Sequence, residues 1–195
     1  MENQVAEQLD LIEGMILEGR KTMERSGWVF VMWGVAHVTA TVLTFFWPDY
    51  YGMLWGGLMG TCGFIMGIVG RRNEAKRRKS SVMGRAQGAA WGAFLISLFI
   101  LWVAGPVSGS LTYPSPAGFL AVFFVLIGGA NFQSGVTINL PMQTRVGLLW
   151  WIAGVLILFM PSATTTVFLV MALIAEIGFG LYLMSLERKG EAARV

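Results

Sequence analysis

The chain has 195 residues, of which 55% are hydrophobic and 13% charged, and it carries a net charge of +3 with one histidine and one cysteine. One histidine and one cysteine cannot make a structural zinc site, and no phosphate-binding glycine loop followed by lysine occurs, so we expect no metal and no cofactor. All 14 lysines and arginines lie outside six long apolar runs, which predicts an integral membrane protein.

Residues 1–27, before the first apolar run, are predicted to form a cytoplasmic amphipathic helix. Apolar residues recur there at spacings of four and three, which places them on one stripe: Val5, Leu9, Ile12, Ile16, Gly19 and Met23. The early turns are acidic and the last turns basic, as the helix dipole favours. Such a helix would lie at the membrane interface, dock beneath the membrane helices or pair with another copy. Its acid-rich start is the reverse of a signal peptide.

The six apolar runs cover about residues 28–47, 53–70, 89–105, 118–138, 146–160 and 164–186. Most are close to the roughly 20 residues that an α-helix needs to cross a bilayer. Loops 48–52, 106–117 and 161–164 hold one charged residue, Asp49, whereas the lysines and arginines lie on the other side. The positive-inside rule therefore predicts six transmembrane helices in a bacterial inner membrane, with both termini in the cytoplasm.

A repeated spacing along the chain predicts three helical hairpins. A glycine stands 14 residues before a proline in each odd-numbered run: Gly34–Pro48, Gly92–Pro106 and Gly147–Pro161. Proline lacks an N–H and clashes with the preceding turn, so each odd helix is expected to end at the outer interface. The predicted fold is an all-α membrane protein with a six-helix bundle over 28–186, hairpins at about 28–70, 89–138 and 146–186, and a cytoplasmic tail at 187–195.

Glycines are regularly spaced in the second apolar run, and small residues at such a spacing let two helices approach closely. They are Gly52, Gly56, Gly60, Gly63 and Gly67. The pattern predicts helix packing, either inside the bundle or between two copies of the chain. Basic residues crowd the loop that follows: Arg71, Arg72, Lys76, Arg77, Arg78 and Lys79. We expect these residues to contact lipid head groups rather than nucleic acid.

Of the acids, the bases and the lone histidine, only His37 and Glu176 lie deep inside the apolar runs. Both lie roughly 15 Å from the cytoplasmic ends of their helices, so a closed bundle would bring them side by side. Asn131 and Glu176 each follow an outer-loop proline by 15 residues, and Gln133 lies two residues after Asn131. A carboxyl group at this depth must be protonated, paired with a polar partner or in contact with water. The four residues are predicted to form either a proton-responsive or substrate-contacting site, or a hydrogen-bond network that fixes helix packing.

Four segments carry a family likeness: LIEGMILEGRKTMERSGWVFVMWG, RRNEAKRRK with the WGAF after it, GGANFQSG and LPMQTRVGLLWWIAG. Through them the chain resembles an uncharacterised family of small bacterial six-helix integral membrane proteins. That resemblance implies no activity, although some members are encoded near small winged-helix regulators. The glycine–proline rhythm is also similar to that of the HdeD-type acid-resistance membrane proteins, which repeat a two-helix unit three times. The long N-terminal helix and Glu176 depart from that pattern, so the second likeness implies only a link to stress or acid.

No nucleophile and base are spaced for catalysis, so the protein is not expected to be an enzyme. We expect a structural, sensory or stress-response component of the membrane. Its partners would be the lipid bilayer and either a second copy of the chain or another cytoplasmic or membrane protein. The alternative is a small proton-linked transporter or channel whose path passes Glu176.

Overall fold

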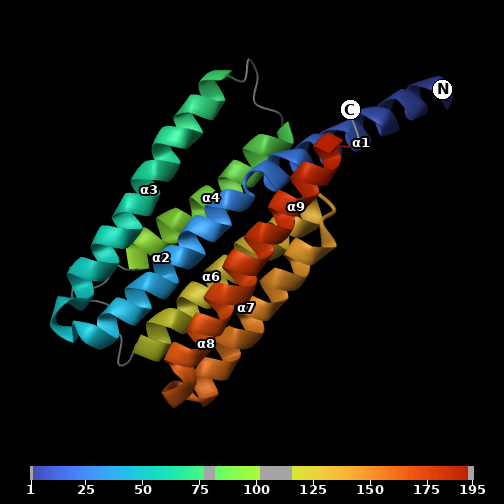
Figure 1. The fold of residues 1–195 in the computed structure, drawn as a ribbon. Coiled ribbons are helices and arrows are strands. Elements are labelled where there is room, and N and C mark those ends of the chain that lie inside the picture. The colour runs from blue at the N-terminus through green and yellow to red at the C-terminus, as the bar shows by residue number, and fades with distance from the viewer. Residues whose placement is uncertain (1, 77–81, 102–115, 193–195) are drawn as a thin grey trace. The chain divides into compact units, whose positions relative to one another are not determined.

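The computed structural model describes residues 2–76, 82–101 and 116–192, and every regular element in these ranges is a helix (Figure 1). Among these residues, five helices are long and apolar enough to cross a membrane: Gln4–Phe46, Pro48–Val69, Ala117–Thr137, Pro141–Phe159 and Pro161–Gly190. The protein is therefore a multi-pass membrane protein whose described ranges are helical. The third predicted run, 89–105, extends beyond the described residues, so the count of six remains a prediction.

The helices follow one another along the chain as α1 (Glu2–Arg25), α2 (Gly27–Phe46), the 3₁₀ turn η1 (Pro48–Tyr50), α3 (Tyr51–Lys76), α4 (Val82–Phe99), α6 (Pro116–Thr137), α7 (Pro141–Phe159), the 3₁₀ turn η3 (Pro161–Ala163), α8 (Thr164–Met171), the π-helix η4 (Ala172–Gly178) and α9 (Phe179–Ala192). Pro48 and Pro161 stand just after the ends of α2 and α7, where a residue without an N–H costs least. Pro141 opens α7 for the same reason.

A helix does form before the first membrane run, and it ends one residue before Ser26. Its early apolar residues stay open: Val5, Leu9 and Ile12 are each more than half exposed. Burial begins near its end, where Met23 is 6% exposed. The helix itself is therefore present, whereas its place at the membrane and its partner remain predictions.

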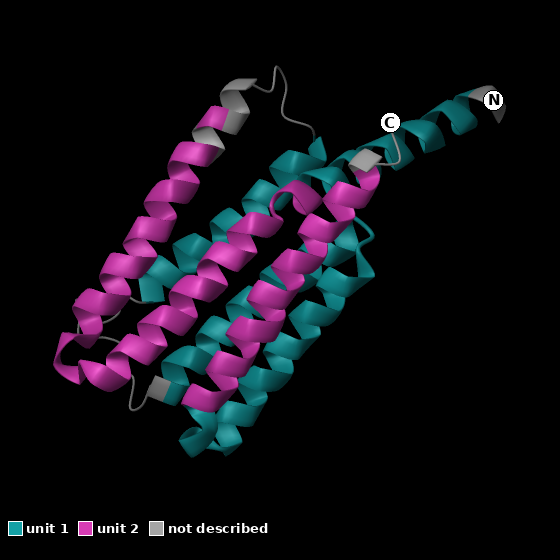
Figure 2. Ribbon diagram, in the orientation of Figure 1, with its two compact units in different colours: residues 1–22, 81–164 teal, residues 23–80, 165–195 magenta. Residues whose placement is uncertain are grey.

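The chain divides into two compact units, coloured separately in Figure 2. Unit 1 contains residues 1–22 and 81–164, with nearly all of α1 and all of α4, α6 and α7. Unit 2 contains residues 23–80 and 165–195, with α2, α3, η4, α9 and almost all of α8. The predicted third hairpin, 146–186, has α7 in one unit and α9 in the other, so the hairpin arrangement remains a prediction.

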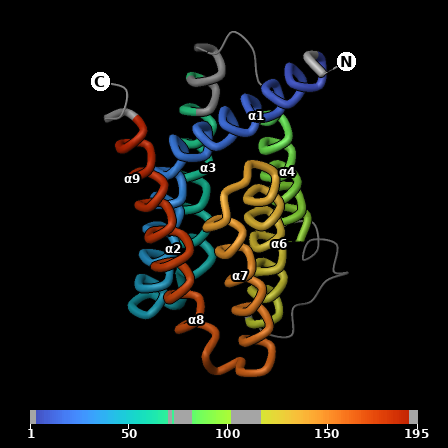
Figure 3. Tube along the Cα trace, turned by 90° about the vertical axis from the view of Figure 1, so that its right-hand side faces the viewer, coloured from blue at the N-terminus to red at the C-terminus, as the bar shows by residue number. Residues whose placement is uncertain are grey.

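In unit 1, α6 and α7 lie side by side (Figure 3). Asn139 lies in the turn between them with φ 51°, a left-handed conformation that asparagine adopts more readily than most residues. The helices touch through glycine: a Cβ on Gly147 would lie 2.6 Å from the backbone N of Phe132. The rings of Phe124 and Trp150, both fully buried, pack 4.9 Å apart in the core.

In unit 2, α2 packs against η4 and α9, again through glycines. A Cβ on Gly27 would lie 2.6 Å from the carbonyl oxygen of Gly180, so neither position accepts a side chain without separating the helices. Helix α3 packs on the opposite end of α2 near Thr44, whose Oγ1 accepts a hydrogen bond of 3.2 Å from Trp55 Nε1.

Candidate functional site: a buried histidine–glutamate pair

His37 of α2 and Glu176 of η4 form a buried pair within unit 2. Nδ1 of His37 and Oε2 of Glu176 lie 2.7 Å apart, and the two residues are 6% and 2% exposed. A proton on either atom completes the hydrogen bond, because imidazole and carboxyl groups can each donate or accept. The pair can therefore gain, lose or shift a proton without breaking its contact, which an aliphatic or amide pair cannot do.

Glu176 lies in a π-helical segment, Ala172–Gly178. The Phe179 N–H bonds to the carbonyl of Ile174, five residues earlier, in place of the usual four. Such wide turns are rare and are frequent at functional sites. The helix resumes its α geometry on either side, in α8 and α9, so the irregularity is confined to the turn that carries the carboxyl group.

Three aromatic rings from three helices surround the imidazole of His37. The ring centroids of Trp33, Trp55 and Phe168 lie 5.9, 6.0 and 5.3 Å from that of His37. Trp55 and Phe168 also contact each other, at 5.7 Å. These rings fill the space beside the imidazole and leave little room for bulk water. Their packing fixes the orientation in which Nδ1 meets Glu176.

The hydroxyl groups of two threonines on α2 stabilise this arrangement through hydrogen bonds. Thr41 Oγ1 donates a 2.8 Å hydrogen bond to the carbonyl of His37, one helical turn earlier. Thr44 Oγ1 donates in the same way to Ala40 and accepts the indole N–H of Trp55. Trp55 is thereby held against the histidine.

The pair is electrically isolated along its own elements. Neither α2 nor the segment from Thr164 to Gly178 carries another Asp, Glu, Lys or Arg. On α3, the ionisable side chains before Arg71 are Tyr51 and Cys62. A proton gained or lost at the pair therefore changes the charge of a long apolar stretch by one unit, with no neighbouring charge on these segments to offset it.

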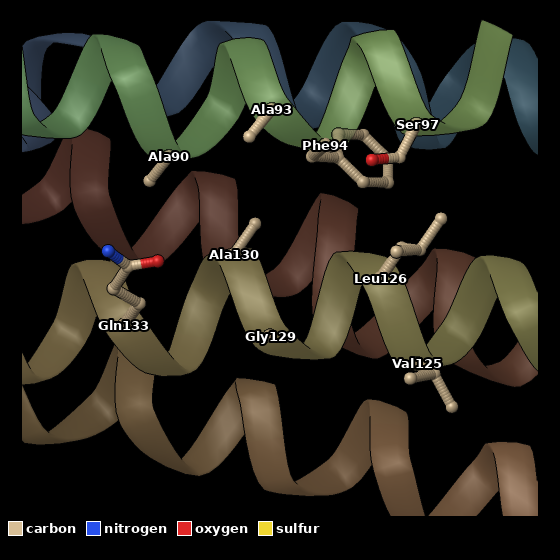
Figure 4. Close-up of a pocket in the computed structure, with 9 residues that line it drawn as sticks. All are labelled: Ala90, Ala93, Phe94, Ser97, Val125, Leu126, Gly129, Ala130 and Gln133. Atoms are coloured by element: carbon tan, nitrogen blue, oxygen red, sulfur yellow. The ribbon is translucent and has the colours of Figure 1, made fainter. Parts of the chain in front are cut away.

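Asn131 and Gln133, the other two residues of the predicted site, lie on α6 in unit 1. Asn131 is fully buried and its Nδ2 donates a 2.9 Å hydrogen bond to Ile127 within the same helix. Gln133 lines a groove of about 200 Å³ between α4 and α6, with Ser97 toward the other end (Figure 4). The predicted four-residue site is thus divided between the units, with the ionisable pair in unit 2.

The glycines expected to pack, Gly52, Gly56, Gly60, Gly63 and Gly67, have no atom within 4 Å of a Cβ built on them. Close helix contact falls on other glycines, among them Gly34 and Gly147, so a contact between two copies through α3 stays a prediction. Of the basic cluster, Arg71, Arg72 and Lys76 belong to α3, and Arg72 is exposed. Arg77, Arg78 and Lys79 lie outside the described residues.

The sequence showed no sign of the aromatic shell or the π-helix. Trp33 stands one turn before His37, a spacing that places both on one face of α2. Trp55 and Phe168 come from distant parts of the chain, so no local pattern links them to the histidine. The π-helix lacks proline and has no distinctive composition.

No protein-family model matches the chain, and no curated protein or solved structure is similar to it. Within the described ranges, no three His, Cys, Asp or Glu residues gather where they could hold a metal ion. We therefore take the buried pair of His37 and Glu176, with the helices that position it, as the candidate functional site.

Proposed function

We propose that the protein is a non-enzymatic, proton-responsive sensory component of a bacterial inner membrane. The observation that carries this proposal is the 2.7 Å contact between His37 and Glu176 inside helices without other charges. Histidine is the side chain whose ordinary titration falls nearest neutral pH, and a carboxyl group deep in a membrane is functional more often than not. Together they make a site that responds to proton activity.

This role requires a defined orientation in the membrane, and the distribution of lysines and arginines favours one. Six transmembrane helices in three hairpins would place both termini in the cytoplasm, with α1 as a cytoplasmic helix. The basic residues after α3 would then meet lipid head groups on that side. A second copy or another cytoplasmic or membrane protein would receive the signal through α1 or the end of α9.

The structure suggests how a proton change would reach the cytoplasmic end. Glu176 begins the path, because η4 continues directly into α9. Near the far end of α9, Glu187 Oε1 lies 4.0 Å from Nε of Arg25, the last residue of α1. A shift of the π turn moves α9 along or about its axis. That movement would alter the contact between Glu187 and Arg25, and so the position of α1.

A proton-linked transporter or channel is the second candidate, and it needs a route for solute past Glu176. Two grooves open on unit 1, one lined by Gln133 and one by Arg145, and neither includes His37 or Glu176. At 2% exposure, the carboxyl group touches no open surface. These observations favour a sensor, in which a proton binds but no solute crosses.

The chain holds a single histidine, so histidine labelled with ¹⁵N reports on His37 alone. The experiment follows its resonances over about pH 5–8 in purified protein, where histidines commonly titrate. In parallel, it follows the reactivity of a cysteine placed at Lys189 in a Cys62→Ala background. A sensor changes both signals with the same midpoint, and Glu176→Gln abolishes the shared response. Glu7→Gln, an exposed acid on α1, is the matched control and leaves both unchanged.

Three outcomes separate the candidates. If the histidine titrates while the reactivity at Lys189 stays constant, the pair is not coupled to the cytoplasmic end and the sensor is excluded. Proton flux into reconstituted vesicles that Glu176→Gln blocks would establish the transporter. If neither signal depends on pH, the pair is a packing contact.

A further inference from the structure

Unit 1 contains a second buried polar cluster, formed by Gln87 of α4 with Asn131 and Ser134 of α6. Their exposed fractions are 7%, 0% and 1%. Gln87 Nε2 donates a 3.2 Å hydrogen bond to the carbonyl of Ser134, which brings the α4 side chain against this part of α6. Asn131 and Ser134 are three residues apart and therefore share one face of α6.

Each of these side chains has an oxygen that remains unpaired. Gln87 Oε1, Asn131 Oδ1 and Ser134 Oγ have no hydrogen-bond partner among the described residues. The amide nitrogens of Gln87 and Asn131, in contrast, both donate to backbone carbonyls. A buried oxygen without a hydrogen-bond donor is costly. Three of them in one cluster indicate that a ligand or a water molecule donates to them.

The chemistry of the cluster restricts what it can bind. Its three oxygens are uncharged, and α6 has no acidic or basic side chain while α4 has only Arg85. The cluster therefore needs hydrogen-bond donors. A neutral donor fits better than a cation, whose charge no carboxylate would balance.

We propose that Gln87, Asn131 and Ser134 form an internal hydration site, in which ordered water donates to their three free oxygens. Buried waters commonly make about three hydrogen bonds to polar groups that lack other partners. The groove between α4 and α6 offers a route of entry (Figure 4). It is lined by Ala90, three residues after Gln87, and by Ala130, four residues before Ser134, and these spacings put each pair on one helix face. The three residues of the site belong to unit 1, whereas His37 and Glu176 belong to unit 2.

The direction in which one substitution shifts the thermal midpoint of unfolding distinguishes a hydrated site from a dry one. Ser134→Ala changes the side-chain volume very little and removes the unpaired hydroxyl oxygen. With bound water, the variant loses hydrogen bonds to that water and its thermal midpoint falls by several degrees. In a dry cluster, Ser134→Ala removes an unpaired buried oxygen and the midpoint rises. Ser97→Ala, at the other end of the groove from Gln133, is the control and leaves the midpoint unchanged.

A direct measurement is made on the wild-type protein. Magnetisation transfer from water to the side-chain amide protons of Gln87 and Asn131 should be strong, and each signal should vanish when that residue is changed to leucine. A rise of the midpoint in Ser134→Ala, or no transfer from water to either amide, overturns the proposal. A midpoint that rises in potassium or sodium chloride but not in choline chloride overturns it in favour of a cation site.

Discussion

Gly34 lies directly against Glu176: a Cβ built on the glycine would stand 2.9 Å from the Cβ of the glutamate. The same atom would lie 2.6 Å from Ile177 Cγ1 and 3.1 Å from the carbonyl oxygen of Ala172. No other residue type lets α2 approach the π-helix this closely. The glycine that marks the first repeat in the sequence therefore positions the carboxyl group for His37, one turn further along α2.

Gly34→Ala should separate α2 from η4 and lengthen the contact between His37 and Glu176. Overpacking of this kind typically costs about 1–3 kcal/mol. We expect a lower thermal midpoint and a changed ¹⁵N spectrum of the single histidine. Gly57→Ala on α3 is the matched control, because a Cβ there has open space and alanine favours the helix. Equal stability of the two variants would contradict the close approach.

A double-mutant cycle tests the pair itself. Either Glu176→Leu or His37→Leu alone leaves a buried partner without its hydrogen bond, which costs about 1–3 kcal/mol, and more where the remaining group is charged. The double variant removes both groups and should be less destabilised than the sum of the single changes. Unfolding of the purified protein in detergent measures all four free energies. Strictly additive losses would mean that the two side chains do not interact.

Unit 1 offers a matched pair of neighbouring glycines. A Cβ on Gly128 would meet the indole of Trp151 at 2.5 Å and the carbonyl of Gly147 at 3.0 Å, whereas a Cβ on Gly129 meets nothing within 4 Å. Gly128→Ala should therefore weaken the packing of α6 on α7 and lower the stability by about 1–3 kcal/mol. Gly129→Ala should be neutral or slightly stabilising. Thermal unfolding of both variants checks the difference, and the opposite order would exclude this packing.

The orientation in the membrane is tested by labelling. In a Cys62→Ala background, a cysteine at Asp49 or Ser162 should react with a membrane-impermeant reagent added to intact cells. A cysteine at Lys189 should react only after the cells are opened, because the lysines and arginines favour a cytoplasmic C-terminus. External labelling of Lys189→Cys in intact cells would show that the C-terminus lies outside, and would contradict the predicted orientation.

Some features of the site follow from local sequence and others do not. The ends of α2 and α7 are set by Pro48 and Pro161 within a few residues, so sequence alone places them. The depth of a residue in the membrane is also local, since it depends on its count along a helix. For this reason the matched depths of His37 and Glu176 were enough to suggest their contact.

Partner choice between helices is not local. Asn131 matches Glu176 in position along its helix, yet it belongs to α6 in unit 1, because depth says nothing about which helix lies opposite. The same limit applies to glycine. Gly56 and Gly60 have the spacing of a packing motif but open surroundings, whereas Gly34 is closely packed against η4. Only the three-dimensional arrangement distinguishes these cases.

The π turn leads to the last prediction. A turn closed by a bond over five residues holds one residue more than an α-helical turn, so removing one residue should restore α geometry without disturbing the helix on either side. Ile174 is suited to deletion because its side chain is 57% exposed. The variant lacking Ile174 should fold with its α9 contacts, including Gly180 against Gly27, but with Glu176 rotated away from His37.

Its histidine spectrum should therefore resemble that of Glu176→Leu, and its pH response at Lys189 should disappear. Deletion of Leu181 is the control, because this residue lies in the regular α-helix α9. Its removal rotates every later residue by about 100° about the helix axis. That variant should lose stability, as the positions packed against α2 are displaced. If the Ile174 deletion is the more damaging of the two, or if it keeps the His37 response, the π turn does not serve to present Glu176.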